Sequence, residues 1–477
     1  MIKFLKILIG LIISIVISTY LWDFISISYS NPGNVVGYYS EQAISPLNNL
    51  IRFVTFTTLP IIVYIFLHKI ILKENLINFI LIFKNHQLSL KKNNVLNLYL
   101  YLFFVLIFFN FLSTDFYLSN VDYFHEGLSL SSGLNSNISG LFWSGSFIAN
   151  SLLSEFLSSK ISWFLTQKET IGSFRFFHQI LRFLTEIILV CLIYNLCKLF
   201  NYSKEKQIFF FVVISLVCLY LNRSLTELFY PVRYRDIPIL LILIFAFKSI
   251  SSNLTNKINS LIIGFLSCAS ILWSFDRGIY VNILILFLIT IFLIKKKYTD
   301  IIFLFFGILL SWICFYIFFG NLEVQNFLNN SFSISKYTDF IIGIEHPKPF
   351  DFDSNKHASR GTKNLLLIII NGIFISYIIL NKNSKISSNS KLYLLFFFFC
   401  AYINYKSGIT RSDSYHMKQS IFFQNILFIT LIMNFLIEKM ENFKFNIFKK
   451  NISYFLIILI LLFSIKDFKI YNILNFK

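Results

Sequence analysis

The chain has 477 residues, of which 56% are hydrophobic and only 14% are charged. No soluble fold of this size could bury so many apolar side chains, so we predict an all-α integral membrane protein whose main solvent is the lipid bilayer. The net charge of +19 does not indicate a nucleic-acid partner, because most lysines lie in short loops between apolar stretches, where they set topology.

Apolar segments of roughly 20 residues, the length that crosses a bilayer, recur along the whole chain. The first is not followed by the small residues of a signal-peptide cleavage site, so we expect it to stay as an uncleaved helix. We predict a polytopic bundle of about thirteen transmembrane helices, at residues 4–22, 52–72, 97–113, 179–198, 207–221, 237–250, 259–274, 279–294, 299–319, 363–381, 392–405, 419–437 and 452–466.

Lysine sets the predicted orientation of these helices. With a cytoplasmic N-terminus, lysine-rich loops such as 295–297 fall on the cytoplasmic side at nearly every turn, as the positive-inside rule requires. The non-cytoplasmic face then receives the long connections 23–51, 114–178, 222–236, 320–362 and 406–418.

Arginine is distributed differently from lysine, although lysine is the usual cation of this chain. The planar guanidinium suits a bidentate partner such as phosphate or carboxylate, and structural pairing with loop acids is the alternative. Most acids and five of the seven histidines map to the same side, so we predict a polar site that faces away from the cytoplasm. All nine arginines fall there or at the outer ends of helices: Arg52, Arg175, Arg182, Arg223, Arg233, Arg235, Arg277, Arg360 and Arg411.

The first candidate segment follows the third apolar helix. It contains Asp122, His125 and Glu126, with Asp115 a short way upstream. These residue types can supply a general base and a partner that orients it. The alternative is a solvated loop with a turn at Gly127.

An amphipathic stretch comes next, from Leu141 to Leu165. Apolar residues recur at every fourth position between 148 and 156, which predicts a helix lying in the membrane interface. Trp143 and Trp163 would anchor it there. A buried loop helix without a functional role is the competing interpretation.

Two further segments combine arginine with aspartate. Arg233 and Arg235 lie before an apolar helix and could clamp a phosphate at headgroup level, or one of them could pair with Asp236. Asp276 and Arg277 form a short turn between two helices, where charges usually pair or do work. Adjacent residues pair awkwardly, so we expect each of these two to have another partner.

The fourth segment is the late turn that contains Arg411, Asp413 and His416. It places a cation, an anion and a group that titrates near neutral pH within six residues,, and a merely polar hairpin is the alternative. No cofactor is expected. The spacing of Asp351 and Asp353 is one that can hold a divalent metal, although it often occurs by chance.

These segments together resemble the GT-C class of membrane glycosyltransferases, of the bacterial type that uses polyprenyl-phosphate sugars. The resemblance covers about residues 97–420 and rests on layout and short motifs. Segments 122–127, 143–147 and 171–175 resemble the first external loop of bacterial members. The Asp276-Arg277-Gly278 and Arg411–His416 motifs also look like those of related membrane proteins.

The resemblance implies an inverting transferase in the bacterial inner membrane, with its active site on the periplasmic face. Asp122 would be the general base, with Asp115 or Glu126 in reserve, and the partners would be a polyprenyl-phosphate sugar, a glycan or lipid-linked acceptor and the bilayer. Arginines of the later segments would face the phosphate. The chain would divide into an N-terminal helix pair with a cytoplasmic loop (1–96), a core with external loop 114–178 (97–320), an external loop (321–362) and C-terminal helices (363–477).

Three other functions remain open. An O-antigen polymerase or ligase would place the chemistry in the loop 320–362, with His357 and Arg360. A transporter or flippase of lipid-linked glycans would use Glu186 and the external charges, although the chain shows no clear inverted repeat. A structural membrane subunit would have no chemistry at all.

Overall fold

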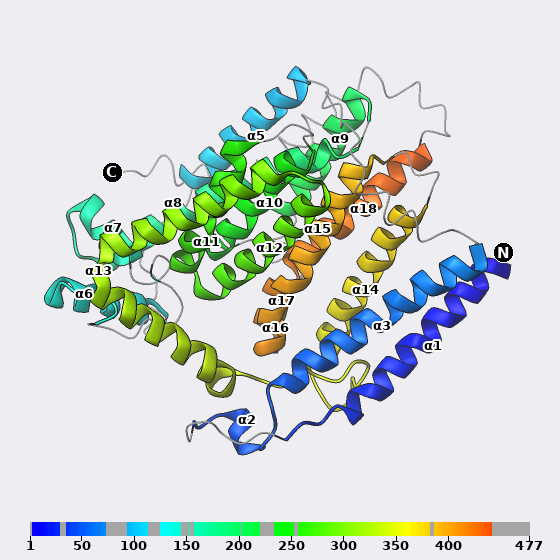
Figure 1. Ribbon diagram of the computed structural model, residues 1–477, viewed down its shortest axis with the longest axis horizontal. Coiled ribbons are helices and arrows are strands. Elements are labelled where there is room, and N and C mark those ends of the chain that lie inside the picture. The colour runs from blue at the N-terminus through cyan, green and yellow to red at the C-terminus, as the bar shows by residue number, and fades with distance from the viewer. Residues whose placement is uncertain are drawn as a thin grey trace. The chain divides into compact units, whose positions relative to one another are not determined.

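The computed structural model describes residues 2–28, 35–72, 93–112, 125–144, 152, 157–200, 202–219, 233–251, 256–381 and 386–440 (Figure 1). Within these ranges every named element is a helix, and β pairing is limited to two isolated bridges. The all-α prediction is therefore confirmed.

The chain divides into two units. Unit 1 comprises residues 1–88, 225–230 and 333–435. Its described helices are α1 (Ile2–Phe24), α2 (Tyr38–Glu41), α3 (Leu47–Leu72), α14 (Ala358–Leu380), α15 (Ser388–Asn404), α16 (Lys406–Thr410), α17 (Ser414–Ser420) and the larger part of α18 (Phe422–Met440).

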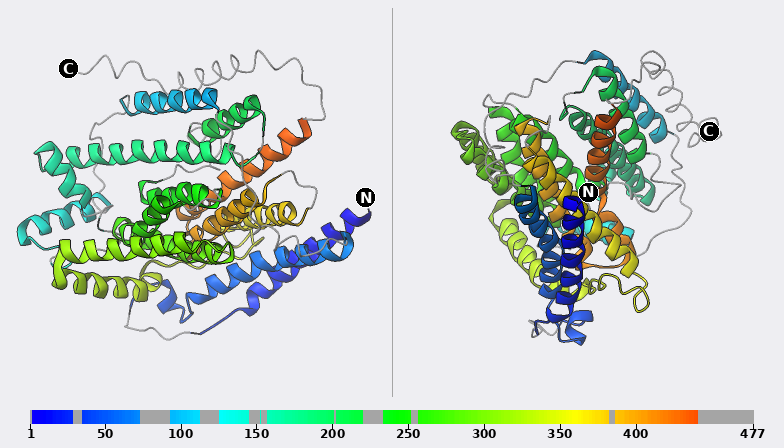
Figure 2. Two further views of the ribbon diagram at one scale, coloured as in Figure 1. Left: turned by 45° about the horizontal axis from the view of Figure 1, so that its top comes forward. Right: turned by 90° about the vertical axis from the view of Figure 1, so that its right-hand side faces the viewer.

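Unit 2 comprises residues 89–224, 231–332 and 436–477. Figure 2 shows its helices α5 and α8 running side by side. Its described elements are α5 (Asn94–Leu112), α6 (His125–Ser139), α7 (Leu157–Thr166), α8 (Ile171–Cys197), α9 (Lys204–Leu219), the short 3₁₀ helix η3 (Tyr234–Asp236), α10 (Ile237–Ser251), α11 (Lys257–Trp273), α12 (Phe275–Ile294) and the larger part of α13 (Tyr298–Ile342).

Many of these helices are long and apolar enough to cross a membrane. In the described part of the chain, eight meet both criteria, or nine if the bent pair α17 and α18 forms one span. Twelve of the thirteen predicted segments coincide with helices, and the thirteenth, 452–466, lies outside the described residues. The membrane environment is thus supported, and the count of about thirteen stays a prediction.

Local sequence explains where several helices begin. Thr170 caps α8, Asn256 caps α11 and Ser387 caps α15, each through a side-chain oxygen that accepts a backbone N–H of the first turn. Ser, Thr and Asn are the residues preferred at the N-cap, and each of these three lies a few residues before an apolar run,. The N-cap residues therefore indicate where these helices start, in addition to the apolar pattern.

The core of unit 1 lies between α1, α3, α14 and α16. It is built from Trp22, Phe53, Phe56, Leu365, Ile368, Ile369, Tyr405, Ile409 and Ile421, all buried. In unit 2, α11 and α13 approach closely at two glycines. A Cβ at Gly264 would lie 2.0 Å from the Leu304 carbonyl oxygen, and one at Gly307 would lie 2.2 Å from that of Leu261. Only glycine permits this backbone contact.

Helix α13 corrects the prediction for the late loop 320–362. Gly320, with φ of 76°, interrupts the helix, but helical structure resumes and continues to Ile342. The apolar run ends at this glycine, which is why the sequence predicted the end of the helix there. The non-helical connection is confined to residues 343–357.

Candidate active site

The first predicted segment lies only partly within the described residues. Asp115 and Asp122 lie outside them, and His125 opens helix α6 without a described side chain. Glu126 follows in the first turn of α6, where the structure forms a helix through Gly127 instead of the turn weighed above. Its two carboxylate oxygens accept hydrogen bonds of 2.5 and 2.8 Å from Nε and Nη2 of Arg175 on α8.

This Glu126–Arg175 pair joins two parts of the predicted site that are far apart in sequence. Both side chains are largely buried, and the contact is bidentate, which is the strong geometry for arginine and carboxylate,. Glu126 is therefore engaged as a structural partner of Arg175, and Asp115 and Asp122 are left as candidates for the base.

The stretch from Leu141 to Leu165 differs from the prediction of one interfacial helix. Residues 141–144 are not helical, most of 145–156 lies outside the described residues, and α7 begins at Leu157. Trp143 and Trp163 are both 8% exposed, so they are buried rather than interfacial anchors. Trp143 contacts the rings of Phe315, Phe319 and Phe327 on α13.

Glu323 on α13 fixes the start of this stretch. Its carboxylate accepts backbone N–H groups from Trp143 at 2.7 Å and Phe142 at 3.1 Å, and the hydroxyl of Ser144 donates to it as well. Glu323 is 5% exposed. Sequence reasoning gave Glu323 no role in the site, because its partners, two backbone N–H groups and the Ser144 hydroxyl, lie about 180 residues away.

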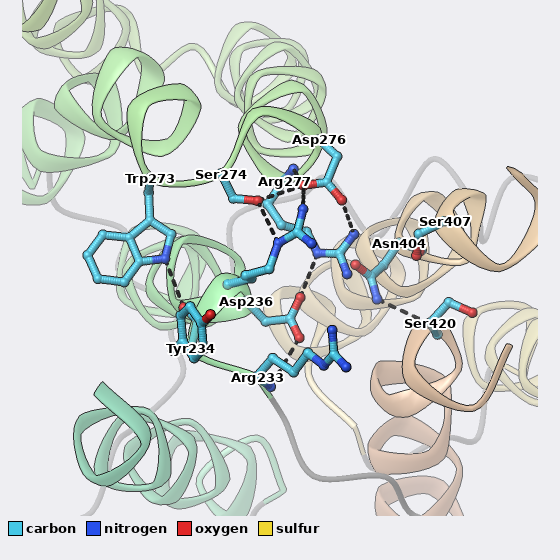
Figure 3. Close-up of polar contacts among 11 residues, drawn as sticks. Arg233, Tyr234, Asp236, Trp273, Ser274, Asp276, Arg277, Asn404, Ser407 and Ser420 are labelled. Atoms are coloured by element: carbon cyan, nitrogen blue, oxygen red, sulfur yellow. Dashed lines mark hydrogen bonds and ion pairs between the residues drawn. The ribbon is translucent and has the colours of Figure 1, made fainter. Parts of the chain in front are cut away.

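The second and third predicted segments meet in unit 2 (Figure 3). Arg277 of α12 donates from Nε to Asp236 of η3 at 2.6 Å and from Nη1 to Asp276 at 2.8 Å. Arg235 of η3 donates from Nη2 to Asp276 at 3.1 Å. The expectation that Asp276 and Arg277 would not pair is wrong, whereas each does have a second partner as expected.

We call this cluster, with its neighbours Arg233 and Ser274, the Arg–Asp network. Ser274 donates to Asp276 at 2.6 Å and accepts from Nε of Arg235 at 3.2 Å. The backbone N–H of Arg233 donates to Asp236 at 3.3 Å. Arg277 and Asp236 are each about 5% exposed, so their charges are balanced by one another rather than by water.

The Arg–Asp network is connected to α8 through an aromatic contact. The ring of His178, one turn after Arg175, lies 4.9 Å from the ring of Tyr234 in η3. The indole N–H of Trp273 donates to the Tyr234 carbonyl oxygen at 2.8 Å, as Figure 3 shows. Three of the four predicted polar segments thus converge on one region of unit 2.

The five charged side chains of the Arg–Asp network do not cancel one another completely. Arg233, Arg235 and Arg277 carry three positive charges, and Asp236 and Asp276 carry two negative ones, so the sum is +1. Asp236 was weighed only as an ion-pair partner for the arginines, and Ser274 and His178 were not among the predicted site residues. The only sequence signal for Ser274 and His178 was that each is a polar residue close to a predicted motif.

The fourth predicted segment belongs to unit 1. Asp413 caps α17, accepting from the His416 backbone N–H at 2.9 Å, and its carboxylate also contacts His416 Nδ1 at 2.8 Å and Arg411 Nε at 3.0 Å. Burial alone would raise the pKa of Asp413, but the contacts from His416 and Arg411 hold it below its usual range. The segment is therefore a connected triad.

Residues of the alternative late-loop site also lie in unit 1. Arg360 donates from Nη1 to the hydroxyl and, at 3.1 Å, to the carbonyl oxygen of Ser414. His357 precedes α14 as its N-cap residue. No group of three or more metal-ligating side chains occurs in the part of the chain that the structure describes.

Comparison with protein-family models, curated proteins and solved structures finds no match for this chain. Its function is therefore argued from its residues and their geometry.

Proposed function

We propose that this protein is a polytopic membrane glycosyltransferase of the GT-C type, with about thirteen transmembrane helices and an active site on the non-cytoplasmic face. It transfers a sugar from a polyprenyl-phosphate donor to an acceptor hydroxyl in the bacterial inner membrane. The observation that carries the proposal is the convergence of α6, the start of α8, η3 and the α11–α12 turn, each of which contributes an acid or an arginine.

The proposed reaction divides its work between a base and a set of cations. The Asp122 carboxylate takes the proton of the acceptor hydroxyl, whose oxygen attacks the anomeric carbon from the face opposite the phosphate. The bond between the anomeric carbon and the phosphate oxygen breaks, and the lipid phosphate leaves with its electron pair. General-base catalysis contributes roughly 10²–10⁴-fold to such reactions.

The Arg–Asp network supplies preorganised positive charge for the departing phosphate. Arg235 and Arg277 are held by carboxylates, and Arg235 also by Ser274, so their positions are fixed before the phosphate charge develops,. Because Arg235 and Arg277 are paired with Asp236 and Asp276, these four side chains form an oriented array with little net charge. Arg233, the N-cap residue of η3, adds a third guanidinium beside that array.

The test is sugar transfer by the purified full chain in lipid, comparing wild type with Asp122→Asn. We expect at least about a 100-fold loss in the variant, because the amide cannot accept the proton, and normal yield of folded protein. Glu41→Gln is the control, since Glu41 is an exposed acid of α2 in unit 1 to which no role in the site is assigned. Wild-type transfer by Asp122→Asn would reject Asp122 as the base.

The same variants separate the other functions that the sequence left open. Dependence on His357 and Arg360, with Asp122→Asn active, would favour a polymerase or ligase. Lipid-linked glycan movement without sugar transfer would favour a transporter.

A further inference from the structure

Helix α8 has a charged stripe along its apolar length. Arg175, Arg182 and Glu186 occupy positions i, i+7 and i+11, which lie on one face of an α-helix,. The helix itself is one of the candidate membrane spans. Charges within a span are costly and usually either pair with one another or bind something.

The stripe lies between two packed sides of α8. On one side, Phe183 lies against Phe111 of α5, with 5.2 Å between ring centroids. On the other side, His178 lies against Tyr234 of η3. Successive residues are rotated by about 100° around the helix axis, so Arg182 projects from α8 in a direction between those of Phe183 and His178. The charged face is therefore bounded by α5 and η3, and it leads along α8 toward the Arg–Asp network.

The two arginines of the stripe differ in how fully they are engaged. Arg175 is held by both oxygens of Glu126. Arg182 donates only from Nε, to Glu186 at 3.2 Å, and its side chain is 40% exposed. Glu186 is its only polar partner in the described part of the chain, so the donors of both Nη groups remain for a ligand.

The position of Arg182 indicates what kind of ligand this would be. It lies about 10 Å further along α8 than Arg175, by the rise of seven residues. An anion reaches that position in an apolar span when it is attached to a lipid tail. Because Glu186 neutralises Arg182, a free anion would bind only weakly at this position. Burial of an attached lipid tail must therefore provide part of the binding free energy.

We propose that Arg182 binds the phosphate of a lipid-anchored isoprenoid substrate, held by its Nη groups while Glu186 fixes the guanidinium from the Nε side. This inference rests on the proposed function, because it assigns a position to the polyprenyl phosphate of the donor. The phosphate site is then on α8 beside η3, where Arg182 holds the bound phosphate and the Arg–Asp network supplies the charge that stabilises it as it departs.

The experiment measures binding of radiolabelled polyprenyl phosphate to the full chain in nanodiscs, without any transfer step. Arg182→Gln removes the charge and is expected to weaken binding at least about tenfold. Arg182→Lys retains the charge but lacks the two Nη donors of the guanidinium, so its affinity is expected to lie between those of wild type and Arg182→Gln. Lys168→Gln, at the exposed turn before α8, removes the same charge and should bind like wild type. Glu186→Gln should bind at least as tightly as wild type, because the amide oxygen can still accept from Arg182 Nε while the negative charge beside the anion is removed.

Competition identifies the ligand and separates this inference from the function. Unlabelled polyprenyl phosphate should displace the label, and inorganic phosphate and phosphatidylglycerol should not. Displacement by either of the latter at similar concentration would overturn the proposal, as would wild-type binding by Arg182→Gln. If that variant binds normally while transfer still requires Asp122, the inference fails and the proposed function stands. If Arg182→Gln loses binding while the wild type transfers no sugar, the lipid-phosphate site is supported and the proposed transferase function is rejected.

Discussion

At the residue scale, the buried contact between Arg277 and Asp236 is the clearest feature of the candidate site. The sequence predicted that the two motifs would be charged and near a helix end, since charge and apolar pattern are local properties. It could not predict which arginine pairs with which aspartate. That choice depends on how η3 packs against the α11–α12 turn, 41 residues apart.

Removing Arg277 should destabilise the protein more than removing both partners. Arg277→Gln leaves the Asp236 charge buried, and we expect a loss of about 3–5 kcal/mol of stability. The double variant with Asp236→Asn should recover much of that loss. The measurement is a double-mutant cycle of thermal unfolding in detergent, and an additive result would show that the two side chains do not interact.

His346 should make stability depend on pH. It lies in the 343–357 connection of unit 1, buried, with Nε2 3.2 Å from the Tyr405 hydroxyl and Nδ1 3.0 Å from the Pro347 carbonyl oxygen. Burial lowers its pKa to about 4, below the usual 6.5. Between these values the unfolded chain binds more protons, so stability falls as pH decreases through this window, by about 3 kcal/mol in total.

The check for His346 is the pH dependence of thermal unfolding between pH 7 and pH 4. His346→Gln cannot take up the proton, so its melting temperature should fall less steeply than that of wild type. Parallel curves for the two proteins would show that His346 is not buried in its neutral form.

At the element scale, the apolar helices were predictable and the polar ones were not. Continuous apolar runs locate the C-terminal ends of α3, α8 and α12 to within one residue, whereas the helices begin four to eight residues before the predicted segments. Helix α6 escaped prediction because its serines and asparagines have no apolar period. The part of α13 after Gly320 escaped because a glycine at the end of an apolar run looks like a stop signal.

The close crossing of α11 and α13 gives a prediction at this scale. Gly264→Ala places a methyl group 2.0 Å from a backbone oxygen of α13, so the helices must separate, and we expect a clear loss of thermal stability. Gly127→Ala in α6 is the matched control, because its Cβ would meet no described atom within 4 Å. Alanine favours helix over glycine by up to about 1 kcal/mol, so the control should be neutral or more stable. Equal melting of both variants would contradict the crossing.

At the scale of the whole molecule, composition predicted a helical membrane protein, and the structure agrees. The orientation remains a prediction based on lysine. Within unit 2, the lysine-rich turn 295–297 and the Asp276–Arg277 turn lie at opposite ends of α12. The polar site and the lysines therefore belong on opposite sides of the bilayer if α12 crosses it.

Cysteine labelling in intact cells tests this orientation. In a chain whose six cysteines are replaced by serine, Lys168→Cys should react with an impermeant maleimide added outside the inner membrane. Lys296→Cys should react only after the membrane is permeabilised. Both positions are exposed. The reverse pattern would place the candidate site in the cytoplasm and exclude a donor used on the non-cytoplasmic face.

The most direct test of the central claim is transfer by the wild-type protein in lipid from a panel of radiolabelled donors. We predict transfer from a polyprenyl-phosphate sugar, with inverted configuration at the anomeric carbon, and none from the corresponding nucleotide sugar. Transfer from nucleotide sugars, a product with retained configuration, or no transfer from any polyprenyl-phosphate donor would contradict the account.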